Sequence, residues 1–244
     1  MPYIVALISL CAVYVLALYL MRYAKRGFVC NFFFLAVVLG CYLTIGVIVY
    51  SDVGFYDWNF QNLMPVANVS PFMFATAPLF LLAPKRVRGY GFLLISLLSV
   101  GMFLSGVFGC VYNAVIHYKF HFHFLLDYIA HFALSLFGIY LIRTGQARFT
   151  RRGFFVSSAM IFGVALVMLL LNLIFDTSFF GLSLNGKHNI YNVVLVGNSY
   201  LSALIYFIGL MAVLLLGAAA AKLASAPCFA LFTKEKNTKN YTIQ

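Results

Sequence analysis

Seven long apolar runs dominate this 244-residue chain and leave few folds open to it. A helix crosses the hydrocarbon core of a membrane in about 20 apolar residues, which is close to the length of each run. Lipid offers no hydrogen-bond partner to an unpaired backbone group, so every run is predicted to be helical. The expected spans are 3–20, 27–50, 60–82, 90–111, 122–142, 154–175 and 193–221.

The composition supports lipid as the solvent for most of the chain. Hydrophobic residues make up 64% of the sequence and charged residues only 9%, more apolar surface than a soluble domain of this size can bury. The net charge of +11 does not indicate nucleic-acid binding, because the basic residues form short clusters between apolar runs and not one basic face. We therefore predict an all-α fold with one transmembrane domain (1–222), a short polar cytoplasmic tail (223–244), and membrane lipid in place of a nucleic-acid partner.

The distribution of Lys and Arg predicts the orientation. Fourteen of the sixteen basic residues lie in alternate connections or after the last run, and only Lys119 and Lys187 lie on the other side. Basic residues concentrate in cytoplasmic loops. Seven spans with the N-terminus outside and the C-terminus in the cytoplasm satisfy this rule. The first run is long and lacks a small-residue cleavage site, so it is expected to remain as a span.

Four of the five histidines fall in residues 117–132, HYKFHFHFLLDYIAHF. His123, Asp127 and His131 are four residues apart and share one helical stripe. Three interpretations remain open: a metal site, a catalytic base or proton relay in which Asp127 orients His131, and a structural polar pair. The stripe extends about 12 Å along one helix and has no HExxH spacing, so no metal is predicted. The five dispersed cysteines form no CxxC pair, and no cofactor is expected.

The polar residues inside the spans concentrate in the predicted outer half of the bundle. His131 lies about 13 Å below the outer start of its span, and Asn68 lies about 12 Å below the start of its own. Pro65 and Pro71 are expected to interrupt the span 60–82. We expect an outward-facing cavity around Asp127 and His131, and its further lining residues are Asn68, Ser70, Asn113, Asn172 and Asn198.

Three segments carry a family resemblance: LMPVANVSPF, LLDYIAHFALSLFGIYL and DTSFFGLSLNGKHNIYN. In their order they resemble the YwaF-like bacterial membrane proteins, which are related to the vertebrate transmembrane acyltransferase family of ether-phospholipid remodelling. The resemblance covers most of the chain and implies a seven-span bundle in a bacterial cell membrane. In the acyltransferase relatives a cysteine in the third span carries the acyl group and a histidine in the fifth activates it. The histidine corresponds to His131.

The cysteine has no counterpart here. The family pattern resembles PxHxCN, whereas this segment reads LMPVAN, which places Ala67 at the cysteine and Pro65 at the histidine. Alanine cannot form a thioester. Either the chain uses other chemistry, with Ser70 as the hydroxyl, or it binds a lipid or small molecule without acyl transfer. Ser70 is one turn deeper and about 60° off the expected face, next to Pro71, and the sequence does not favour it.

Three functions follow from these features. The first is a lipid-handling membrane protein which, if it is an enzyme, is an acyltransferase-like transferase with an altered nucleophile. The second is a carrier or channel for a small solute, because transporters also use interrupted spans and intramembrane ionisable residues. The third is a structural subunit of a larger membrane complex, whose protein partners the sequence does not identify.

Overall fold

The computed structural model describes residues 2–21, 27–51, 69–116, 122–175, 179–182 and 199–225. These residues form seven α-helices and one short 3-10 helix and include no strand, which confirms the all-α prediction. The predicted tail is 223–244, and its residues from 226 onward lie outside the described part of the chain. The elements are α1 (Pro2–Leu20), α2 (Phe28–Ser51), α3 (Val69–Leu82), α4 (Lys85–Ile116), α5 (Phe122–Arg143), α6 (Arg151–Phe175), η3 (Phe179–Gly181) and α8 (Ser199–Ser225).

Six of these helices are long and apolar enough to cross a membrane, so the chain is a polytopic helical membrane protein. The remaining helix, α3, has 14 residues and a length of about 21 Å. It covers the second part of the expected span 60–82, whose residues 60–68 lie outside the described part of the chain. The described structure therefore confirms the membrane class and leaves the count of seven spans as a prediction.

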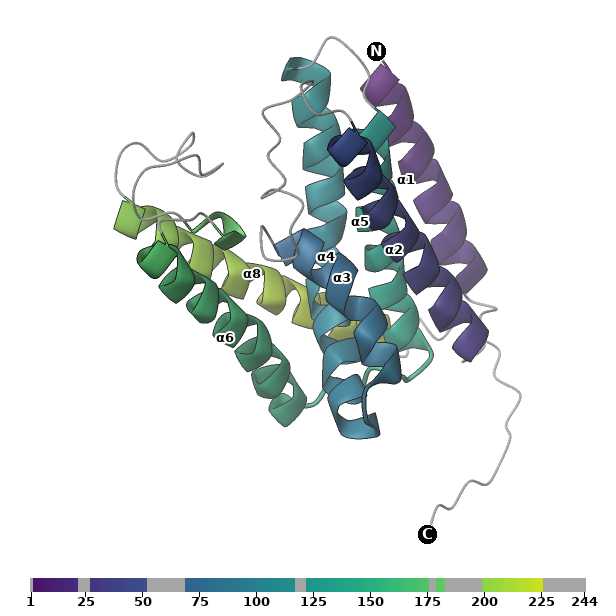
Figure 1. The fold of residues 1–244 in the computed structure, drawn as a ribbon. Coiled ribbons are helices and arrows are strands. Elements are labelled where there is room, and N and C mark those ends of the chain that lie inside the picture. Colours follow the sequence, from purple (N-terminus) through teal and green to yellow (C-terminus); the bar gives the residue numbers. More distant parts are fainter. Residues whose placement is uncertain are drawn as a thin grey trace, which may run out of the picture.

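Helices α4 and α5 form the centre of the bundle and share its most extensive contact. Helices α1 and α2 lie on one side of this pair, α6 and α8 lie on the other, and the short α3 packs against α2 and α4 (Figure 1). Many side chains of α5 are buried, among them Tyr128, Phe137 and Tyr140. Helix α5 also carries Asp127 and His131, so both residues lie on the central helix, where His131 is buried and Asp127 is partly exposed.

Small residues allow α4 and α5 to approach closely. A Cβ atom at Gly138 of α5 would lie 2.7 Å from the Ser99 Cβ of α4. Ser96 of α4 donates a hydrogen bond of 2.9 Å to the carbonyl of Gly138. Membrane helices associate through such small-residue contacts and interhelical hydrogen bonds, because lipid provides no hydrophobic driving force between them.

Large apolar side chains cover the outer faces of the peripheral helices. Val5 on α1 is 61% exposed, Val29 on α2 is 78% exposed, and Ile174 on α6 is 71% exposed. A water-soluble protein rarely exposes apolar surface so continuously. These faces therefore fit a surrounding of lipid.

The described basic residues lie at or beside helix ends, and the starts of α4 and α6 and the end of α5 are drawn in the lower part of Figure 1. These basic residues lie where α4 and α6 begin and where α5 and α8 end, and they are Lys85, Arg86, Arg88, Arg143, Arg148, Arg151, Arg152 and Lys222. Near the end of α5 the side-chain amides of Asn31 and Gln146 bond reciprocally at 2.9 and 3.2 Å. The α5–α6 connection turns at Gly145, whose φ of 68° suits glycine after a helix C-terminus.

Candidate functional site

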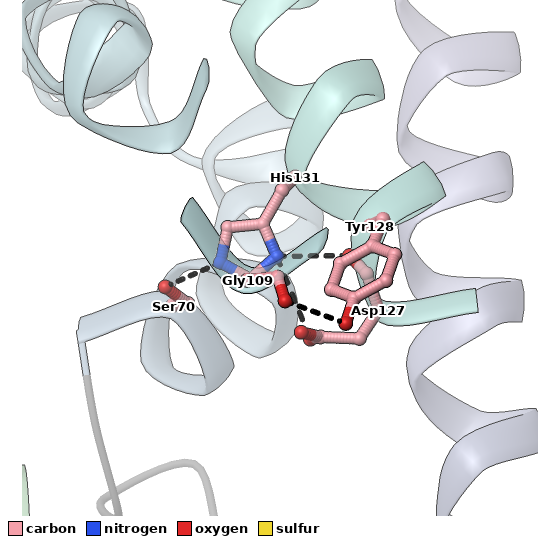
Figure 2. Close-up of polar contacts among 5 residues, drawn as sticks. All are labelled: Ser70, Gly109, Asp127, Tyr128 and His131. Atoms are coloured by element: carbon pink, nitrogen blue, oxygen red, sulfur yellow. Dashed lines mark hydrogen bonds and ion pairs between the residues drawn. The ribbon is translucent and has the colours of Figure 1, made fainter. Parts of the chain in front are cut away.

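The polar centre of the described structure is a hydrogen bond between two helices that are far apart in sequence. Ser70 Oγ of α3 lies 2.9 Å from His131 Nε2 of α5. On the other side of the imidazole ring, Nδ1 lies 2.8 Å from the backbone carbonyl oxygen of Asp127 (Figure 2). The ring therefore bridges a hydroxyl and a main-chain carbonyl, and His131 is only 6% exposed.

These contacts fix the tautomer of His131. A carbonyl oxygen can only accept a hydrogen bond, so Nδ1 must carry the proton in the bond to Asp127. In the neutral ring Nε2 is then the unprotonated nitrogen, and it accepts a hydrogen bond from the Ser70 hydroxyl. Hydroxyl, imidazole and orienting oxygen lie in the order that nucleophilic catalysis requires.

The Asp127 carboxylate has a secondary place in this arrangement. Its Oδ1 atom lies 3.5 Å from His131 Nδ1, farther than the carbonyl of the same residue. The side chain is 33% exposed, whereas that of His131 is 7% exposed. At 3.5 Å this contact is longer than a good hydrogen bond, so the carboxylate adds an electrostatic contact to the one made by the main chain. The main-chain carbonyl of Asp127 makes the shorter contact with the imidazole, and the orienting role predicted for the Asp127 carboxylate stays a prediction.

Helix α4 positions the imidazole from behind. A Cβ atom at Gly106 would lie 2.9 Å from the Phe132 ring and 3.4 Å from the His131 Cβ atom. At Gly109 a Cβ atom would lie 2.8 Å from the Tyr128 ring, and the Tyr128 hydroxyl donates a 3.0 Å hydrogen bond to the Gly109 carbonyl. The two glycines let α5 lie directly against α4 at the level of the site. This close packing of α4 against α5 restricts the motion of the His131 side chain.

Helix α3 presents Ser70 from its first turn. Ser70 is the second residue of the helix and Pro71 the third. A proline lacks the N–H that would bond the carbonyl four residues earlier, and for Pro71 that carbonyl belongs to residue 67, outside the described part of the chain. The interruption expected at Pro71 therefore stays a prediction, and Pro78 is the proline inside the described helix. One turn after Ser70, Phe74 meets the His131 ring edge-on with centroids 5.0 Å apart.

The other predicted lining residues have different places. Asn172 is 3% exposed, and its amide bonds to the backbone of Phe179 and Leu182. Asn113 lies in α4, but its side chain falls outside the described part. The predictions for Asn68, Asn198, Pro65 and Ala67 fall outside the described residues. His123, which shares the stripe of His131, packs its ring against Phe124 with centroids 4.3 Å apart.

The structure adds three residues to the site that sequence reasoning missed. Phe74 contacts the imidazole, and Gly106 and Gly109 provide the space for it. A signal for the glycines is present in the segment SGVFGC, where they are three residues apart on one helical face. Among the described residues no group of three or more His, Cys, Asp or Glu side chains is placed to hold a metal ion.

The chain matches no protein-family model, no curated protein and no solved structure. The resemblance to YwaF-like proteins therefore stays a prediction. The contacts of Ser70, Asp127 and His131 are the basis for assigning a function.

Proposed function

We propose that this protein is a multi-pass membrane enzyme that transfers an acyl group of a membrane lipid through Ser70, with His131 as general base. The observation that carries the proposal is the 2.9 Å contact between Ser70 Oγ and His131 Nε2, because the other ring nitrogen is held as a donor by the Asp127 carbonyl. A nucleophile, a base within hydrogen-bond reach and a group that orients the base are the parts of a serine acyl-transfer site.

The reaction has two balanced steps. Ser70 Oγ attacks the carbonyl carbon of a lipid ester while His131 Nε2 takes the hydroxyl proton. The ester C–O bond then breaks, His131 returns the proton to the leaving alcohol, and the acyl group remains on Ser70. In the second step an acceptor alcohol attacks the acyl-serine, its proton passes to His131 and then to Ser70 Oγ, and the new ester leaves. No oxidant, reductant or metal is needed.

The surroundings favour transfer to a lipid alcohol over hydrolysis. The imidazole is 6% exposed and lies against Phe74, which is 1% exposed, so little water reaches the proposed general base. The Asp127 carboxylate at 3.5 Å stabilises the imidazolium that forms in each step.

The proposed orientation is seven spans, with the N-terminus outside and the C-terminus in the cytoplasm of a bacterial cell. The described basic residues at the starts of α4 and α6 and at the end of α5 support it, as does Lys222 of α8, which lies over the Phe149 ring of the α5–α6 connection. In this orientation Ser70 and His131 lie in the outer half of the bundle. An outward-facing cavity around them would admit lipid from the outer leaflet.

The test is chemical labelling of the purified protein in detergent with a fluorophosphonate that carries an alkyl chain. Attack by Ser70 on phosphorus releases fluoride and leaves a stable adduct that peptide mass spectrometry locates. We expect labelling of wild-type protein on Ser70, none for Ser70→Ala, and a rate lower by about 10²–10⁴-fold for His131→Ala. Labelling of Ser70→Ala at the wild-type rate would overturn the proposal.

A second assay measures the reaction itself. Vesicles that contain a phospholipid with a fluorescent acyl chain and a lysophospholipid acceptor are incubated with reconstituted protein, and the products are separated by chromatography. We expect transfer of the fluorescent chain by wild-type protein and none by Ser70→Ala. Absence of transfer, together with solute uptake that His131→Ala abolishes, would favour the carrier function. A stoichiometric co-purifying protein without transfer would favour the subunit function.

A further inference from the structure

The short helix η3 contains an aromatic residue in an unusual backbone conformation. Phe180 has φ 56° and ψ 19°, in the left-handed region, and its side chain is 0% exposed. A bulky residue there is strained compared with a right-handed conformation, because its Cβ atom lies too close to the following carbonyl oxygen. Such strain persists only where the surroundings hold it in place.

Asn172 near the end of α6 holds this turn. Its Nδ2 group donates to the carbonyls of Phe179 at 2.9 Å and Leu182 at 2.7 Å, and its Oδ1 atom accepts from the Phe179 backbone N–H at 2.7 Å. The Leu182 N–H also bonds to the Phe179 carbonyl at 3.1 Å. The amide of Asn172 therefore closes the turn around Phe180 and fixes the direction of its ring.

The Phe180 ring packs on the helix that carries the nucleophile. It meets Phe72 of α3 edge-on, with centroids 5.7 Å apart. Phe72 is two residues after Ser70, which places it about 160° around the helix from the serine. Phe74 is only about 40° from Ser70, and it faces His131. The start of α3 is therefore held between His131 on one side and Phe180 on the other.

We infer that Phe180 is a positioning residue, which supports the first turn of α3 from behind and keeps Ser70 Oγ within 2.9 Å of His131 Nε2. This inference rests on the proposed acyl-transfer role of Ser70. Helix α3 packs on α2 and α4 and touches α5 at few points, so its contact with Phe180 adds a support on the side of the helix that faces away from His131. A displacement of the reacting groups by about 1 Å can lower a rate by about 10²-fold.

The experiment measures the rate constant kinact and the inhibition constant KI of fluorophosphonate labelling in purified, full-length variants. Phe180→Ala removes the ring. Phe180→Gly removes the ring and also relieves the backbone strain, because glycine accepts a positive φ. We expect both to lower kinact by about 10- to 100-fold with KI within about twofold of wild type, since the probe still binds but the serine is misplaced.

The matched control is Phe162→Ala. Phe162 lies on α6, the helix whose Asn172 holds the turn at Phe180, and its ring stacks on Phe207 of α8 with centroids 5.8 Å apart. This variant therefore removes an aromatic contact of α6 that does not involve α3. We expect its kinact to equal that of wild type. A similar fall of kinact in Phe162→Ala would attribute the effect to a general loosening of α6 and overturn the inference.

Two milder variants keep the inference testable if Phe180→Ala does not fold. Phe180→Leu keeps part of the apolar volume, and Asn172→Ala keeps the ring but releases the turn. We expect both to lower kinact severalfold, and wild-type kinact in both would overturn the inference. Wild-type protein that is not labelled on Ser70 would overturn the proposed function and this inference with it. Normal labelling of wild-type protein and of all Phe180 variants would overturn the inference alone.

Discussion

Tyr14 of α1 and Ser135 of α5 share a buried hydrogen bond of 2.8 Å, and Ser135 lies one helical turn beyond His131. The Tyr14 ring also packs edge-on against Phe132 of α5, with centroids 5.6 Å apart. This contact ties α1 to the central helix next to the site, but it shares no atom with Ser70 or His131. Removing the Tyr14–Ser135 hydrogen bond therefore tests the stability of the bundle without changing an atom of the proposed reaction site.

We expect Tyr14→Phe to lower the free energy of unfolding in detergent by about 0.6 kcal/mol, the average for interhelical hydrogen bonds in membranes. Ser135→Ala should lower the free energy of unfolding by more, about 1–3 kcal/mol, because it leaves the buried hydroxyl of Tyr14 without this hydrogen-bond partner. Denaturant titration of both variants measures the difference. Both should label on Ser70 at the wild-type rate, and a large fall in kinact would show that α1 takes part in forming the site.

Asp127→Asn tests whether the main-chain carbonyl or the carboxylate of Asp127 orients His131. The main-chain carbonyl that bonds His131 Nδ1 remains, and only the carboxylate charge at 3.5 Å is lost. We expect about a tenfold fall in fluorophosphonate kinact, equivalent to about 1.4 kcal/mol. His131→Ala, measured in parallel, should fall by about 10²–10⁴-fold. Equal losses in the two variants would mean that the carboxylate, and not the carbonyl, orients the imidazole.

Gly106→Ala tests the close contact between α4 and α5. The added methyl group would meet the Phe132 ring at 2.9 Å, so the ring and the adjacent His131 must shift. We expect a loss of about 1–3 kcal/mol in unfolding free energy, as for other overpacked cores, together with slower labelling of Ser70.

Gly163→Ala on α6 is the control for this substitution. No atom lies within 4 Å of a Cβ atom at that position, so the protein should keep its stability or gain up to about 1 kcal/mol from the higher helix propensity of alanine. Equal unfolding free energies for Gly106→Ala and Gly163→Ala would contradict the stabilising role assigned to close packing at Gly106.

The proposed orientation is tested by fusions after Gln244. A green fluorescent protein fused there should be fluorescent, and an alkaline phosphatase fused at the same place should be inactive, because the C-terminus is expected in the cytoplasm. Active phosphatase at this position would reverse the orientation and place the basic end of the bundle outside.

The helical membrane class was predictable because it depends on apolar length alone, which can be read residue by residue. The six long helices fall on six of the expected spans. The prediction that His131 belongs to a polar site was possible for a similar reason, since an ionisable group at that depth is costly without a partner.

The sequence did not identify Ser70 as the hydrogen-bond partner of His131. Pro71 beside Ser70 counted against this serine in the sequence, because a proline can distort a helix. The described helix runs from Val69 past Pro71 and brings Ser70 Oγ to 2.9 Å from His131 Nε2, a contact between residues 61 apart that no local pattern indicates. The role of Phe180 was beyond sequence reasoning for a different reason, because its contact with Phe72 joins segments more than 100 residues apart through one backbone conformation.

The bond from His131 to the Asp127 carbonyl has a consequence for how this protein can change in evolution. Every amino acid supplies a main-chain carbonyl, so substitutions at position 127 leave the alignment of the imidazole intact as long as the helix persists. Descendants of this chain could lose the acid and retain a working base. The constraint then falls on the regularity of the helix between residues 127 and 131, where a proline at one of the positions in between or a local unwinding would be far more damaging than a change of charge.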